Sequence, residues 1–120
     1  MIYPENFETK IGFDRIRQLV SENCLSDMGR EKVDRITFSN DHELIGFNLA
    51  AVWEFQNILR FEDYFPSEHY YNISLSLNKI RIQGSFPEVF EVFDLKRSVT
   101  TVKEVISFFR KKDEKDYPSL

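Results

Sequence analysis

Apolar side chains recur at the spacing of an α-helix through the first half of the chain, and they predict three helices there. The first is expected over residues 13–23 and the second over residues 27–36. The third is expected from about residue 40 to residue 62, and its apolar face is broad enough to be substantially buried. The residues that form these faces are Phe13, Ile16, Leu19, Val20, Met28, Val33, Ile36, Ile45, Leu49, Val52 and Leu59.

Polar and special residues mark the ends of these helices. Ser26 is a favourable N-cap for the second helix. Asn40 and Glu43 have the spacing of a capping box at the start of the third helix. Pro66 ends that helix, because the residue before a proline disfavours helical geometry. Gly29 costs the second helix about 1 kcal/mol relative to alanine, so we expect a packing reason for this glycine.

Residues 72–82 have two interpretations. Ile73, Leu75 and Leu77 alternate with polar residues, which is the period of a β-strand. A single strand has no partner, however, because no other segment of the sequence predicts a strand convincingly. Asn72 is also a suitable cap for a short helix, and this context favours the helix.

A long final helix is predicted over residues 87–112. A Gln-Gly-Ser turn at residues 83–85 precedes it, and Pro87 suits the first position of a helix. The fold class that follows is all-α, with about five helices packed as an irregular bundle and a long C-terminal helix. Residues 1–12 form an extended lead-in and residues 113–120 a charged tail. Apolar residues of the final helix step by four and three, close to a heptad repeat: Leu95, Val99, Val102, Ile106 and Phe109.

Composition excludes several classes of protein. The net charge of −4 argues against an independent nucleic-acid-binding protein, since phosphate contacts need clustered lysine and arginine. Cys24 is a single cysteine, which excludes an internal disulfide bond. No apolar run is long enough to span a membrane and the amino terminus does not resemble a signal peptide, so we expect a cytoplasmic protein.

No pattern of catalytic, cofactor-binding or metal-binding residues is present. His42 and His69 are separated by a whole helix and have no neighbouring cysteine at a ligand spacing. Cys24 lies at the end of an apolar helix face, which is typical of a small core residue. The four glycines are scattered and form no phosphate-binding loop. We therefore expect no enzymatic activity and no cofactor or metal in this chain.

Four basic residues are candidates for contact with nucleic acid: Lys79, Arg81, Lys96 and Arg97. The simpler interpretation is favoured, in which they lie on solvent-exposed helix faces with acidic residues between them.

An ordered set of short motifs resembles the core domain of MutS-type proteins. Asn72-Ile73, Gly84 and Phe86-Pro87-Glu88 resemble the family's short helix, its glycine turn and the start of its lever-like helix. Residues 13–19 and 24–31 look like the opening of the second bacterial MutS branch, whose members begin directly with the core domain. The turn in that branch is usually Ser-Pro-Leu-Gly, and here Asp27-Met28 replaces the middle pair. The resemblance covers residues 10–112 and supports a helix at 72–82.

The resemblance implies that residues 13–112 are the N-terminal part of such a core domain. In the whole protein, a later domain binds and hydrolyses ATP with Mg²⁺ and forms a homodimer. A clamp and a C-terminal Smr endonuclease domain contact or cut DNA. The roles associated with the family are mismatch repair, recombination control and rescue of collided ribosomes. This chain is then a non-catalytic segment that couples the ATPase domain to the clamp through packed helices. Its partners are those two domains and, through them, DNA or the ribosome, with no membrane involved.

The alternative is a stand-alone helical adaptor that binds a protein partner through surplus phenylalanines. The chain contains twelve phenylalanines, which is more than a small domain readily buries. If the chain belongs to a larger domain, at least a few of Phe61, Phe65, Phe86, Phe90 and Phe108 should be exposed.

Overall fold

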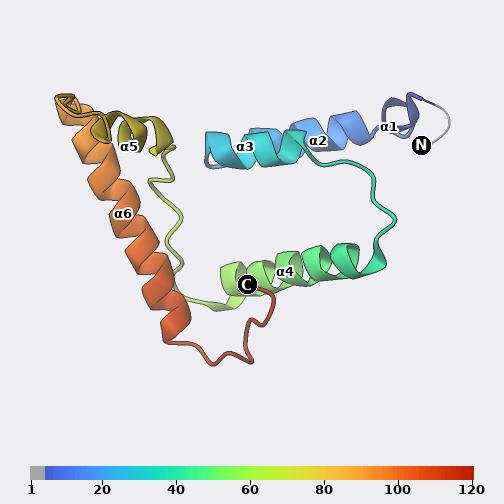
Figure 1. Ribbon diagram of the computed structural model, residues 1–120. Coiled ribbons are helices and arrows are strands. Elements are labelled where there is room, and N and C mark those ends of the chain that lie inside the picture. Colours follow the sequence, from blue (N-terminus) through green and yellow to red (C-terminus); the bar gives the residue numbers. More distant parts are fainter. Residues whose placement is uncertain (1–4) are drawn as a thin grey trace. The chain divides into compact units, whose positions relative to one another are not determined.

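The computed structural model describes residues 5–120, and its regular elements are all helices (Figure 1). The chain divides into two compact units, residues 1–37 and 38–120, which are described separately. The all-α class and the long C-terminal helix are confirmed, with six helices among the described residues. The first unit contains α1 (Phe7–Lys10), α2 (Phe13–Glu22) and α3 (Asp27–Asp34), and the second contains α4 (His42–Phe61), α5 (Ser74–Ile80) and α6 (Val89–Arg110).

In the first unit, α2 packs against both α1 and α3. Arg17 on α2 connects these elements. Its guanidinium donates hydrogen bonds to the carboxylate of Glu8 on α1 and to the carbonyl of Ile36 after α3, each at 2.8 Å. The same group lies 5.0 Å from the centre of the Phe13 ring. Val33 on α3 is the buried apolar side chain of this unit.

The extended lead-in expected over residues 1–12 is wrong for Phe7–Lys10, which form a helical turn. Glu8 and Lys10 have the charge order that favours a helix, and Glu8 is held by Arg17. Gly12 then separates α1 from α2 with a left-handed backbone (φ +75°). Residues 1–4 lie outside the described part of the chain.

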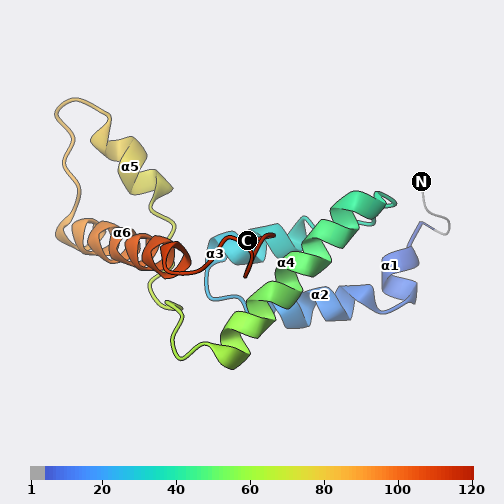
Figure 2. The ribbon, with the colours of Figure 1, turned by 90° about the horizontal axis from the view of Figure 1, so that it is seen from below.

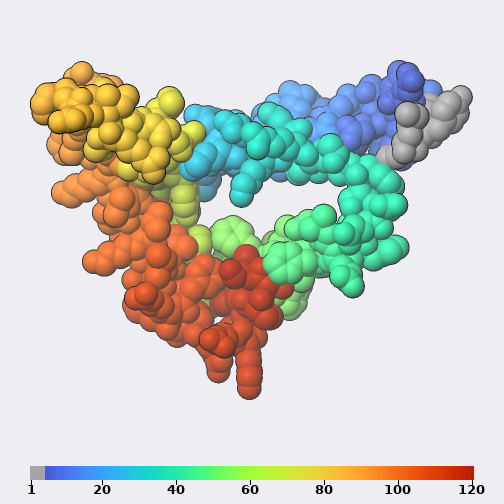
Figure 3. Space-filling model, in the orientation of Figure 1, coloured from blue at the N-terminus to red at the C-terminus, as the bar shows by residue number. Residues whose placement is uncertain are grey.

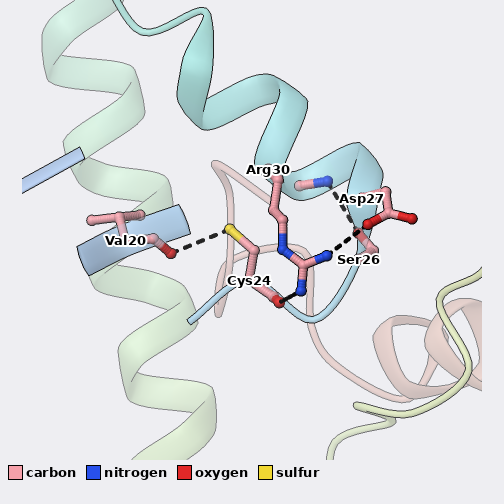
Figure 4. A network of polar contacts seen from close by, with 6 residues as sticks. Val20, Cys24, Ser26, Asp27 and Arg30 are labelled. Atoms are coloured by element: carbon pink, nitrogen blue, oxygen red, sulfur yellow. Dashed lines mark hydrogen bonds and ion pairs between the residues drawn. The ribbon is translucent and has the colours of Figure 1, made fainter. Parts of the chain in front are cut away.

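Ser26 caps α3 as predicted, because its Oγ accepts a hydrogen bond from the Gly29 amide at 3.0 Å (Figure 4). A Cβ atom on Gly29 would lie 3.3 Å from that oxygen and 3.6 Å from Cys24, which explains the glycine. Cys24 is half-buried rather than part of a core, and its thiol lies 3.4 Å from the Val20 carbonyl. Arg30 donates to the Cys24 carbonyl and so closes this network.

In the second unit, α4 begins at His42 and ends at Phe61. Its N-cap is Asp41, whose carboxylate accepts a hydrogen bond from the Leu44 amide at 3.0 Å. The prediction of Asn40 as the cap is therefore wrong by one residue. Asparagine and aspartate are both favourable N-caps, so the sequence alone did not separate Asn40 from Asp41.

Residues 74–80 form a helix, so the strand interpretation of this region is wrong. Asn72 accepts a hydrogen bond from the Ser74 amide at the helix entrance. Gly84 adopts a left-handed conformation (φ +82°) in the turn that follows. The final helix, α6, starts after the N-cap Glu88 rather than at Pro87. The Glu88 amide donates to Glu91 at 2.6 Å, and this bond, with that of Lys79, lowers the pKa of Glu91.

The second unit is more loosely packed than the predicted bundle. Extensive helix–helix contact occurs within the first unit, whereas α4, α5 and α6 are connected mainly through the segments between them. Ile58 on α4 is the fully buried apolar side chain here. Phe61, Phe86 and Phe90 are 78%, 80% and 65% exposed, which agrees with the exposure expected of part of a larger assembly. Phe65 and Phe108 are half-buried.

Replacing Ile58 by alanine should destabilise the second unit by about 2–5 kcal/mol, because it removes a fully buried side chain and leaves a cavity. Leu59→Ala is the matched control, since Leu59 is 60% exposed on the same helix. Urea unfolding followed by circular dichroism measures both variants. Equal losses of stability in the two variants would contradict this packing.

Candidate functional site

The linker between α4 and α5, residues 62–73, runs along α6 (Figures 1 and 2). Two buried hydroxyl groups of α6 hold it. Thr101 Oγ1 donates to the Glu68 carbonyl at 3.0 Å, and Ser98 Oγ donates to the His69 carbonyl at 3.4 Å. Ser98 and Thr101 are buried, whereas Glu68 and His69 are exposed, so the two bonds satisfy buried hydroxyl groups and hold an irregular segment against the helix.

Aromatic rings extend this attachment toward α4. The Phe65 ring of the linker meets Phe55 of α4 and Phe108 of α6 edge to face, with centroids 5.2 Å apart in each pair. Phe109 of α6 lies 6.2 Å from Phe65 on the same side. Such T-shaped pairs contribute about 0.5–1.5 kcal/mol each beyond the area that they bury. Phe65 therefore connects α4 to α6.

Glu62, the C-cap of α4, forms a polar junction between the linker and the end of α6. Lys112 forms an ion pair with its carboxylate, and Tyr117 donates a hydrogen bond to it at 2.8 Å. The hydrogen bonds from Lys112 and Tyr117 lower the pKa of Glu62. The same contact raises the pKa of Tyr117, because the neutral phenol is the donor.

The chain after α6 folds back onto α4 (Figure 3). The Ser119 amide donates a hydrogen bond to Glu54 Oε2 at 2.9 Å. Glu54 is a buried carboxylate on α4, so this contact satisfies a group that is costly to bury alone. The charged tail expected at residues 113–120 is thus part of the second unit.

A hollow of 590 Å³ lies between the start of the linker and α6. Its wall contains both signs of charge, from Asp63 and Glu104 and from Lys103 and Lys111. Mixed charge does not match the evenly basic surface that phosphate groups require. The arrangement of linker, α6 and tail is suited to holding two helices together.

The four residues predicted as nucleic-acid contacts do not form one patch. Lys79 on α5 forms an ion pair with Glu91 on α6 at 2.9 Å. Arg81 is the exposed C-cap of α5. Lys96 and Arg97 are exposed on α6, where both line a hollow of 390 Å³ beside His69. Contact of these four residues with nucleic acid remains a prediction.

His42 and His69 are both exposed and lie on different elements, the start of α4 and the linker. His69 has a left-handed backbone (φ 63°), and its ring lies 3.2 Å from the Tyr71 hydroxyl. Among residues 5–120, no group of three histidine, cysteine or acidic side chains is arranged to hold a metal ion. None of the helices described has the length and apolar character needed to cross a membrane.

Sequence reasoning missed the residues that organise this site. Ser98 and Thr101 lie three residues apart on α6 and so share one face, whereas the hydroxyl of the intervening Thr100 lies on another side. That spacing was the available signal. Glu54 and Glu62 carried no signal, because acidic residues are common on helix surfaces.

Replacing Thr101 by valine should cost about 0.5–1.5 kcal/mol, because it removes the hydrogen bond that holds the Glu68 carbonyl to α6. Thr100→Val is the matched control: its hydroxyl is exposed and bonds within α6, so the change should stay within about 0.5 kcal/mol. Urea unfolding of both variants measures the difference. Similar values for the two would show that the linker is held by other contacts.

Stability should fall more steeply with acid in the wild type than in Glu62→Gln. The folded-state pKa of Glu62 lies below its ordinary value of 4.5, so its contribution is fully present above that value and is lost as the pH falls through the lowered pKa. The effect is modest, because the Lys112 pair is partly exposed. Thermal unfolding between about pH 6 and 3 measures it. Asp63→Asn, which removes a neighbouring carboxylate outside the junction, should retain the wild-type slope.

Comparison with known proteins gives one distant similarity. Endonuclease MutS2 of Fusobacterium nucleatum subsp. nucleatum is 26% identical to this chain over 91 residues, which is 76% of the chain and 12% of that protein. The chain therefore spans about an eighth of the length of this relative. No protein-family model matches, and no solved structure matches. The similarity supports a MutS2-like relationship.

Proposed function

We propose that this chain is a non-catalytic helical segment of a MutS-type DNA-processing protein, in which it couples an ATPase domain to a DNA clamp. The observation that carries the proposal is the similarity to endonuclease MutS2 over three quarters of the chain. In this proposal the core segment is residues 13–112, and ATP and Mg²⁺ bind elsewhere in the parent protein. The parent acts on DNA, in mismatch repair or recombination control.

The second unit supports a mechanical role. Its longest helix, α6, is joined to α4 by the Phe65 ring cluster, by the Glu62 junction and by the returning tail. A displacement at one end of α6 is therefore passed to α4 through side-chain contacts that are short and mutually supporting. Coupling by packed helices needs such contacts rather than reactive groups.

A stand-alone helical adaptor is the second candidate. The exposure of Phe61, Phe86 and Phe90 favours it as much as it favours a segment of a larger protein, because both need apolar surface for a partner. The two functions differ in what the gene encodes after residue 120 and in the response to nucleotide.

The decisive experiment reads the gene beyond the codon for Leu120. The proposal expects an in-frame Gly-x-x-x-x-Gly-Lys-Ser/Thr loop downstream, which cradles phosphate in ATPases. In the protein encoded by that locus, Thr101→Val should weaken the effect of ATP on DNA affinity, whereas Thr100→Val should not. The 120-residue chain alone should neither hydrolyse ATP nor bind DNA at micromolar concentration in physiological salt.

A natural protein that ends at residue 120 and forms a specific complex with another protein would support the adaptor and overturn the coupling function. Tight DNA binding by the chain alone, weakening steeply with salt, would overturn both.

A further inference from the structure

One face of α6 carries an apolar seam, defined here as Val92, Leu95, Val99, Val102 and Ile106. These residues step by three and four, so they line up along one side of the helix. Four of the five are between 46% and 59% exposed, and Leu95 is half-buried. Apolar residues at a spacing of three and four are normally buried against another element. Here no such element covers the seam within the described residues.

One flank of the seam is closed. Ser98 lies on that side and is buried beneath the linker, to which it donates its hydrogen bond. Glu91, one heptad earlier, is held by Lys79 of α5. A helix that covers the seam therefore cannot use this flank for its own charged contacts.

The other flank is open and carries a row of basic residues, of which Lys103 also borders the hollow that contains Asp63 and Glu104. Lys96, Lys103 and Arg110 each follow a β-branched seam residue by four positions, which places them in one row beside the seam. All three are exposed, and none forms an ion pair within residues 5–120. Charges in this position of a heptad decide which partner helix is accepted.

The seam ends at a hollow of 770 Å³, formed by the end of α6 and the returning tail. Ile106 and Arg110 line it together with Tyr117 and Leu120. The hollow continues the apolar seam, and Asp113 and Glu114 line it beside Arg110, so it offers space for an apolar side chain at the end of a covering helix.

We propose that this face of α6 binds a partner helix that has an apolar heptad seam and acidic residues along one edge. The charges exclude a second copy of the chain. If two copies paired with their α6 helices antiparallel, the basic row of one copy would face the basic row of the other. If the helices were parallel, the basic row of each copy would face the flank of the other that the linker covers. A helix rises about 1.5 Å per residue, so the seam is roughly 21 Å long and matches a partner of two to three heptads. The inference holds for either function considered above.

The test uses two synthetic three-heptad peptides with identical leucine seams, one with glutamate and one with lysine at the positions flanking the seam. Fluorescence anisotropy with the full 120-residue chain should show binding of the glutamate peptide, about tenfold tighter than that of the lysine peptide, with the difference shrinking in high salt. Lys103→Glu should reduce or reverse the difference in affinity between the glutamate peptide and the lysine peptide. Lys111→Glu makes the same charge change on another side of α6 and should not.

Val99→Glu should abolish binding, whereas Thr100→Gln, about 100° further round the helix, should retain at least a third of the affinity. Glutamine is used at residue 100 because a glutamate there would pair with Lys96 and Lys103. Both positions are exposed, so both variants should fold. Equal binding of the two peptides, or unchanged binding by Val99→Glu, would overturn the proposal. Concentration-dependent dimerisation that Val99→Glu removes would also overturn it, because the seam would then belong to a second copy.

Discussion

The second unit depends on how an irregular segment is held against a helix: without a repeating backbone ladder of its own, the segment needs hydrogen-bond donors from the helix. Thr101 and Ser98 supply those donors from within α6. Once Glu68 and His69 are fixed in this way, Phe65 reaches the rings of α4 and α6 together. The geometry of the unit therefore follows from two small hydroxyls more than from helix–helix packing.

Few apolar side chains are buried for a chain of this length. Within the described residues, Val33 is the buried apolar side chain of the first unit and Ile58 that of the second, while many large apolar side chains are exposed. Burying apolar area contributes about 25 cal/mol per Å² and must offset the loss of chain entropy. In a chain that leaves so much apolar area in water, covering that area would contribute further free energy of stabilisation.

The sequence was sufficient where the determinants are local. Ser26 identified the start of α3, and Gly84 the turn before α6, because caps and turns depend on neighbouring residues. Residues 72–82 showed the limit of periodicity, since alternation indicated a strand, whereas the lack of a partner strand, the cap at Asn72 and the family resemblance indicated the helix. The turn at Phe7–Lys10 and the role of Thr101 were not predictable, because each depends on a contact between distant parts of the sequence.

The same hydroxyl contacts also determine how α6 can be approached. An apolar seam by itself accepts almost any amphipathic helix, because burial of apolar area is not directional. Specificity needs an asymmetry between the two edges of the seam. By holding the linker against one edge, Ser98 leaves only the basic edge, with Lys96 and Lys103, open to a partner. The hydrogen bond from Ser98 to the His69 carbonyl therefore leaves an apolar face that selects for a partner helix with acidic charge.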